Sequence, residues 1–209
     1  MNTTEVGEDR GLMSIADVRT KAASMGDIVY EILELIEKGF MENKSEILSQ
    51  AADKERRIND MEKLLTKNIL EMSGSSRDKS TLVALEQMVE IFERMGDEAI
   101  GLIERIEIKV QEKLLFSDRG VEQFNETYHA MKDSVSMLRE FLKNPSDELK
   151  KKIVDNGFHV KDLVERYRKE HTERLLNGLC TPMGANMYFD MLDFTGNLAR
   201  HASTIAKLF

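Results

Sequence analysis

Apolar side chains recur along most of the chain at alternating spacings of three and four residues, the period of one face of an α-helix. The clearest stripe lies within residues 80–115, and its members are Leu82, Leu85, Val89, Phe92, Gly96, Ala99, Ile103, Ile106 and Val110. A stripe sustained over about four heptads favours helices packed at small crossing angles, as in bundles and coiled coils. The stripe therefore predicts one helix over residues 80–115, with a length of about 50 Å.

Two further stripes precede this one. The first consists of Val18, Ala22, Met25, Val29, Ile32 and Ile36, and the second, which is less regular, of Ile47, Ala51, Ile58, Met61, Leu65 and Met72. The breaks between the stripes are short, "MENKS" at 41–45 and "SGSSRDK" at 73–79. Three long helices joined by short loops predict an antiparallel up-down-up bundle.

The second half of the chain continues the helical pattern with clear start signals. Ser117 and Asp118 can cap a helix that runs through "HAMKDSVSMLREFL". Asn144 precedes Pro145, and Thr181 precedes Pro182. Each pair predicts an N-cap side chain followed by proline at the first helical position. We therefore expect helices at about 146–177 and 182–208.

The two halves resemble each other. "MGDIVYEIL" from Met25 parallels "MKDSVSMLR" from Met131, and "DKERRINDMEKLL" from Asp53 parallels "DNGFHVKDLVERY" from Asp155, an offset of 102. We predict an all-α fold of two tandem antiparallel three-helix bundles, related by pseudo-two-fold symmetry and sharing a continuous core. The expected divisions are a flexible N-terminus (1–13), a first bundle (14–116) and a second bundle (117–209).

Composition narrows the class of protein. The formal net charge of −8 over 209 residues argues against nucleic acid as a partner, because such binding usually needs a basic surface. A single cysteine, Cys180, excludes an internal disulfide and fits a reducing compartment. The N-terminus lacks the pattern of a signal peptide, and no apolar run approaches the ~18 residues of a membrane span. We expect a cytoplasmic chain without a membrane span.

Acidic residues gather on two helix faces. Glu86, Glu90, Glu93 and Asp97 are spaced to form a stripe on one face, with Gly96 beside them in the apolar seam. Because consecutive bundle helices are neighbours and antiparallel, Glu55 and Asn59 can approach Glu93 and Asp97, with Gly96 allowing the helices to come close. Carboxylates on facing helices build oxygen-ligand metal sites in bundles. In a chain with 38 acidic residues, the alternative is a solvated acidic face.

No pattern for catalysis stands out. The chain lacks a GxxxxGK[ST] loop, a GxGxxG turn and a GxSxG elbow, and its histidines show no metal-binding spacing. The histidines are expected at the surface or at helix ends; they are His129, His159, His171 and His201. We expect no enzyme and no organic cofactor.

Several segments resemble the PhoU family, regulators of phosphate uptake, and above all the PhoU-like domains associated with bacterial sodium/phosphate cotransporters. "ERMGDEAIGLI" at 93–103 is similar to the family signature E-R-I-G-D-x-A-x-x-I. "HTERLLNGLCTPMGANMYFDML" at 171–192 resembles the H-x-x-R-L-x-x-G-x-C…G-x-x-Y-x-D-x-L segment of the cotransporter-associated branch. "HASTIA" at 201–206 resembles H-A-x-N-I-A, with Thr204 where asparagine is usual. "SIADVRTKAASMGDIV" is similar to the first helix of that branch.

The resemblance implies a metal site. Family members can carry metal clusters on E/D-x-x-x-D motifs in the second and third helices of each bundle. The matching first-bundle positions are Glu55, Asn59, Glu93 and Asp97, of which Asn59 departs from the pattern. A divalent or trivalent metal (Mg, Mn, Fe, Ni or Zn) is therefore expected in the first bundle only.

The second bundle has lost these carboxylates. The offset of 102 places Gly157 and Lys161 at the first motif, and anchoring the last helix on "HA…IA" places Gly196 and Arg200 at the second. A competing register would use Asp193 and Asn197 instead. Lys161 and Arg200 would repel a metal cation; they can pair with nearby acids or receive an anion such as phosphate.

Together these observations predict a non-enzymatic, PhoU-like regulator of phosphate transport or phosphate signalling. It would dock on a phosphate transporter or a sensor kinase at the inner face of the cell membrane. Formation of a homodimer is a further possibility that the sequence leaves open. The alternatives are a metal-dependent hydrolase of phosphate esters and a metal-free helical scaffold.

Overall fold

The computed structural model describes residues 13–74 and 76–209. Within these ranges the chain forms helices and no strand. They are α1 (Ile15–Glu42), α2 (Ser45–Ser73), α3 (Lys79–Gln111), α4 (Asp118–Lys143), α5 (Asp147–Leu176) and α6 (Pro182–Leu208). The N-terminus that we expected to be flexible lies outside the described residues, apart from Met13.

Polar side chains fix where the helices begin. Ser14 and Asp17 form a reciprocal capping box at the start of α1. The Thr181 side chain accepts a hydrogen bond from the Gly184 amide at 3.1 Å, with Pro182 as the first residue of α6, as the sequence predicted.

The prediction for the other proline was wrong. Asn144 is the C-cap residue of α4, and the N-cap of α5 is Ser146, whose hydroxyl accepts from the Leu149 amide at 3.2 Å. Pro145 therefore lies in the connection between the helices. Serine is as good an N-cap as asparagine, so the sequence offered two adjacent candidates.

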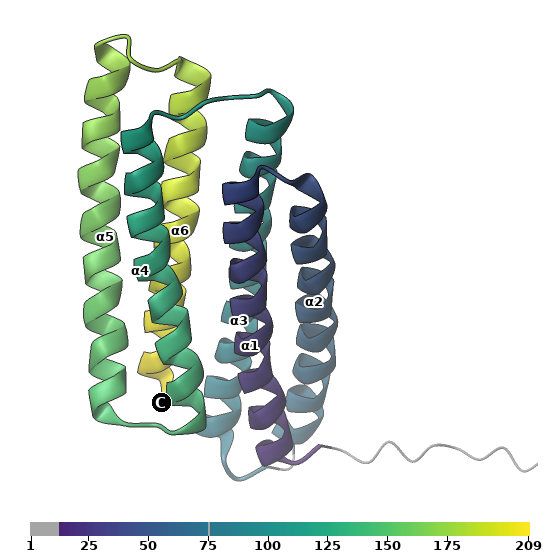
Figure 1. The fold of residues 1–209 in the computed structure, drawn as a ribbon. Helices are drawn as coiled ribbons and strands as arrows, with labels where there is room; N and C mark the ends of the chain where they lie inside the picture. Colours follow the sequence, from purple (N-terminus) through teal and green to yellow (C-terminus); the bar gives the residue numbers. More distant parts are fainter. Residues whose placement is uncertain (1–12, 75) are drawn as a thin grey trace, which may run out of the picture.

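The six helices form two three-helix bundles that stand side by side (Figure 1). α1, α2 and α3 pack against one another, as do α4, α5 and α6. The bundles meet through α3 with α6 and α1 with α4, which are the pairings of a pseudo-two-fold arrangement. α2 and α5 contact only their own bundles, so each lies at an outer side of the molecule. The predicted all-α fold is confirmed.

One hydrophobic core runs through both bundles. The predicted stripes of α1 and α3 are buried along their lengths, and they join buried residues of α4–α6 in a single cluster. Between the bundles, the buried Tyr128 hydroxyl donates to the Leu33 carbonyl at 2.8 Å. At the rim of this contact, Asp27 pairs with Arg139 at 2.7 Å. The bundles are thus joined by both apolar and polar contacts.

The described helices also bear on membrane topology. Despite their length, each carries a polar face, and none of them is apolar enough over a long enough stretch to cross a membrane.

Candidate functional site

The predicted metal residues lie along the seam between α2 and α3. Glu55 is only 7% exposed and packs over Gly96, where an added Cβ would stand 3.4 Å from the Glu55 Cγ. One turn along α2, Asn59 is half-buried, and its Oδ1 has no hydrogen-bond partner among the described residues. On α3, Glu93 is half-buried and Asp97 is exposed.

The electrostatics show that these acids influence one another. Burial raises the pKa of the Glu93 carboxyl, and the negative charges of Asp97, Glu62 and Glu55 raise it further, against a smaller opposing effect of Arg94. A negative charge at Glu93 is therefore disfavoured by its surroundings. This is the environment that a cation would relieve.

The fit to a metal is partial. An unpartnered amide oxygen and a destabilised carboxylate are the oxygen donors that hard cations prefer. However, no group of three or more His, Cys, Asp or Glu side chains within residues 13–74 and 76–209 is arranged to hold a metal ion. The side chains as they stand therefore do not form a complete metal site among the described residues. Metal at this seam stays a prediction.

The glycines of the "ERMGDEAIGLI" segment play different parts. At Gly96 an added Cβ would make ordinary van der Waals contacts, so the approach of α2 does not require glycine there. At Gly101 an added Cβ would stand 2.4 Å from the Phe194 ring of α6. The close helix approach that the sequence suggested at Gly96 is therefore found at Gly101, between the bundles.

Glu98 of the same segment also faces α6. The Glu98 carboxylate accepts a hydrogen bond from the Asn197 amide at 3.2 Å and lies 3.8 Å from the His201 Nε2. The segments at 93–103 and 201–206 are thus brought together at the junction of the two bundles.

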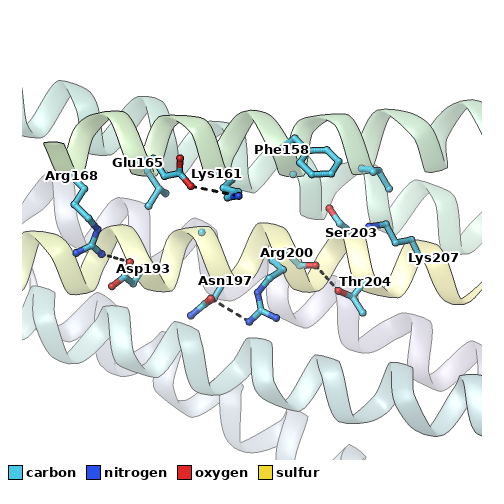
Figure 2. Close-up of a pocket in the computed structure, with 14 residues that line it drawn as sticks. Phe158, Lys161, Glu165, Arg168, Asp193, Asn197, Arg200, Ser203, Thr204 and Lys207 are labelled. Atoms are coloured by element: carbon cyan, nitrogen blue, oxygen red, sulfur yellow. Dashed lines mark hydrogen bonds and ion pairs between the residues drawn. The ribbon is translucent and has the colours of Figure 1, made fainter. Parts of the chain in front are cut away.

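The equivalent seam of the second bundle is an open groove between α5 and α6, about 450 Å³ in volume (Figure 2). Gly157, Lys161, Gly196 and Arg200, the positions at which the sequence placed the lost motif, all line it. Asp193 and Asn197, the residues of the competing register, line it too.

Close contacts distinguish the two registers. In the first bundle Glu55 lies against Gly96; in the second, a Cβ on Gly157 would stand 3.7 Å from the Ala199 carbonyl. These contacts are equivalent under offsets of 102 between α2 and α5 (157 − 55) and 103 between α3 and α6 (199 − 96). The second offset also relates Gly196 to Glu93, which favours the register anchored on "HA…IA". The glycine of this contact lies on α3 in the first bundle (Gly96) and on α5 in the second (Gly157).

The groove carries more cations than acids. Its charged side chains are Lys161, Glu165, Arg168, Asp193, Arg200 and Lys207. Lys161 lies 3.6 Å from Glu165, and Arg168 is hydrogen-bonded to Asp193 across the groove. Among the described residues, the Arg200 side chain donates only to the Asn197 side-chain oxygen, at 3.3 Å. The expected pairing with acids is therefore found for Lys161 and not for Arg200.

A third polar cluster lies at the other end of α5. His171 is 3% exposed and stacks on Tyr188 with ring centroids 4.1 Å apart. Arg174 donates to the Gln123 side-chain oxygen at 2.8 Å and lies 2.9 Å from the His171 Nδ1. His171, Arg174 and Tyr188 are the histidine, arginine and tyrosine of the 171–192 segment, so that segment joins α4, α5 and α6.

Burial decides the charge of this histidine. Desolvation, and then the positive charge of Arg174, lower the pKa of His171 to about 4. It is therefore neutral at neutral pH, and acceptance of the Arg174 hydrogen bond at Nδ1 places its proton on Nε2. The Nε2, the Arg174 Nε and the Tyr188 hydroxyl have no hydrogen-bond partner in the described part of the chain.

Sequence reasoning placed two histidines wrongly. His171 and His201 are buried, whereas His129 and His159 are exposed as expected. Periodicity carried the signal, because His171 continues the buried series Val160, Leu163 and Tyr167 at spacings of three and four.

The molecule is thus an all-helical protein of two related bundles, with an acidic seam in the first and a cation-rich groove in the second. The model of the PhoU domain family matches residues 22–106. This match confirms the resemblance to the PhoU family that the sequence motifs indicated.

Solved structures extend the likeness to both bundles. PhoU from Pseudomonas aeruginosa matches with a TM-score of 0.84 at 18% identity, over 93% of this chain and 94% of that one. The phosphate transport system regulatory protein PhoU from Streptococcus pneumoniae matches with a TM-score of 0.82 at 13% identity, over 93% and 92%. No curated protein matches the chain. At these identities the structures establish the fold, which is the PhoU fold throughout.

Proposed function

We propose that the protein is a non-enzymatic regulator of phosphate transport or phosphate signalling. It acts on the cytoplasmic side of the membrane through contact with a phosphate transporter or a sensor kinase. The observation that carries the proposal is the PhoU domain at residues 22–106, set in a chain that follows the PhoU fold over 93% of its length. The 171–192 segment supports a transporter of the sodium/phosphate cotransporter kind as the partner.

An exposed apolar end supports a role in protein contact. Leu115, in the connection between α3 and α4, is 94% exposed; Leu176 and Leu179, near the connection between α5 and α6, are 81% and 70% exposed. Both connections lie at the same end of the molecule (Figure 1). Large apolar side chains gathered at one end are typical of surfaces that a partner covers. This end is the one we assign to the transporter or kinase.

Co-purification tests the proposal. The tagged chain should retain the phosphate transporter or its sensor kinase from detergent-solubilised membranes, identified by mass spectrometry. Leu179→Asp should weaken that association at least tenfold, because a charge would have to be buried in an apolar contact. Leu70→Asp is the matched control: Leu70 is 72% exposed but lies near the opposite end, at the last turn of α2. If the wild-type chain retains neither the transporter nor the kinase, the proposal is refuted.

Metal in the first bundle would serve this regulator as a structural or regulatory ion, held by Glu55, Asn59, Glu93 and Asp97. Protein purified without chelator should contain about one metal per chain, and the double variant Glu93→Ala with Asp97→Ala should contain none. Elemental analysis for Mg, Mn, Fe, Ni and Zn measures this directly. Equal, substoichiometric metal in both proteins would remove the site.

A further inference from the structure

We propose that the groove between α5 and α6 binds a small organic phosphate, that is, a phosphate group carried on an apolar or planar body. The groove volume of about 450 Å³ falls within the roughly 300–1,000 Å³ of small-molecule sites. The groove lies at the flank of the second bundle, away from the apolar end assigned to the partner. The two proposals therefore stand and fail separately.

Charge makes the groove a site for an anion. Its charged side chains are four cations and two acids, in a chain whose formal net charge is −8. Both acids are already engaged, Glu165 by Lys161 and Asp193 by Arg168. The remaining positive charge is not neutralised by any other side chain that lines the groove.

The two groove cations without an acidic partner, Arg200 and Lys207, are both on α6. Arg200 has the neutral side chain of Asn197 as its hydrogen-bond partner, and Lys207 has no ion-pair or hydrogen-bond partner within the described residues. In Figure 2 both side chains are carried by α6: Lys207 lies along the helix, and Arg200 turns towards Asn197, on the side of α6 away from α5. An arginine fork with unused donors matches the oxygens of a phosphate, and a lysine adds a second point charge.

The remaining lining selects for more than a phosphate ion. Apart from its charges the groove is largely apolar, with Val154, Phe158 and Val164 contributed by α5. Phe158 is 62% exposed, although it is a large aromatic side chain. A planar or apolar group could cover it and stack on its ring. Inorganic phosphate alone would leave this surface in water.

Gly157 and Gly196 keep the two helices close at the bottom of the groove. A Cβ at Gly157 would stand 2.2 Å from the Ser203 Oγ, and one at Gly196 would stand 3.3 Å from the Val164 side chain. The ligand would therefore rest on a floor where a side chain of each helix packs against a glycine of the other.

The first bundle provides an internal comparison. Under the offset of 103 between α3 and α6, Arg200 corresponds to Asp97 and Lys207 to Glu104, so both charges are reversed. The seam between α2 and α3 would repel the anion that the groove between α5 and α6 attracts. An organic phosphate should accordingly occupy one site per chain.

Isothermal titration of the full chain tests the site, with ADP, inorganic phosphate and adenosine as the probes. ADP should bind at least tenfold more tightly than either of the other probes, because only ADP offers both a phosphate and a planar body. Arg200→Glu should weaken ADP binding at least tenfold. Lys151→Glu makes the same change of charge at an exposed position of α5 that does not line the groove, and it should alter binding less than twofold.

Phe158→Ala separates the two halves of the ligand. It should weaken ADP at least threefold and leave inorganic phosphate unchanged. In wild-type protein, ADP should shift the amide resonances of Gly157 and Gly196, which reports the location even if a variant folds poorly.

Three results would overturn the proposal: no saturable binding of ADP up to about 10 mM, equal weakening by Arg200→Glu and Lys151→Glu, or phosphate binding as tightly as ADP. Each of these leaves the co-purification experiment above unaffected.

Discussion

At the scale of single residues, two glycines on one helix should respond in opposite ways to the same substitution. Gly101→Ala places a methyl group against the Phe194 ring and should destabilise the protein by about 1–3 kcal/mol. Gly96→Ala meets only ordinary contacts and gains helix propensity, so it should be neutral or stabilising by up to about 1 kcal/mol. Urea unfolding of both variants measures the difference. Equal destabilisation would contradict the assignment of the close approach to Gly101.

His171 makes a second prediction at this scale, on pH dependence. The pKa of His171 is about 4 in the folded chain, compared with an ordinary value of 6.5 for histidine. Between these pH values the unfolded chain binds a proton that the folded chain does not, so stability falls as pH drops from 6.5 to 4. The loss should amount to at most about 3 kcal/mol.

The variant His171→Gln should flatten the stability profile in this window, whereas His159→Gln, at an exposed position, should leave it unchanged. Denaturant unfolding across the pH range is the measurement. Parallel profiles for wild type and His171→Gln would show that His171 does not carry this dependence.

At the scale of the helices, the caps define where each element begins. Ser146→Ala removes the acceptor for the Leu149 amide and should cost about 1 kcal/mol, or about 2–4 °C in Tm. Ser136→Ala, at an exposed position within α4, should raise Tm slightly because alanine favours a helix. A Tm for Ser146→Ala at or above that of the wild type would show that this cap contributes nothing.

The sequence was most informative about the helices. Long apolar stripes define α1 and α3 because each buries one face along its whole length. The repeat offset then located Gly157 and Lys161, and the "HA…IA" match located Gly196 and Arg200; all four line one groove.

Other features depended on tertiary packing and could not be predicted. The contact of Gly101 with Phe194 joins residues that are 93 positions apart (194 − 101), and periodicity carries no information about such partners. His171 continues a buried helical stripe, but because histidine is polar its side chain was expected at the surface or at a helix end. The apolar floor of the α5–α6 groove likewise emerges only when two helices are placed together.

At the scale of the whole molecule, the shared core predicts that both bundles unfold together. Because α3 packs on α6 and α1 on α4, heat should produce one transition with equal calorimetric and van't Hoff enthalpies. Tyr128→Phe removes the hydrogen bond to Leu33 between the bundles and should cost about 1 kcal/mol. That variant should shift the single transition without splitting it. Two separate transitions would mean that the bundles are independent units.

The charge reversal between the bundles is also a property of the whole molecule. The first bundle has an acidic seam and the second a cation-rich groove at the equivalent place, while both bundles keep the same arrangement of helices. Under the two proposals above, the equivalent places would take ligands of opposite charge, a metal cation in the first bundle and an organic phosphate in the second.

The central claim, that this protein regulates phosphate transport, is tested most directly by phosphate uptake in cells. Radiolabelled phosphate uptake should be measured in the source organism with the gene deleted and with the deletion complemented, under phosphate-replete and phosphate-limited growth. We predict that deletion changes the uptake rate several-fold in replete medium and that the wild-type chain restores it, whereas Leu179→Asp does not. Unchanged uptake in the deletion strain under both conditions would contradict the account.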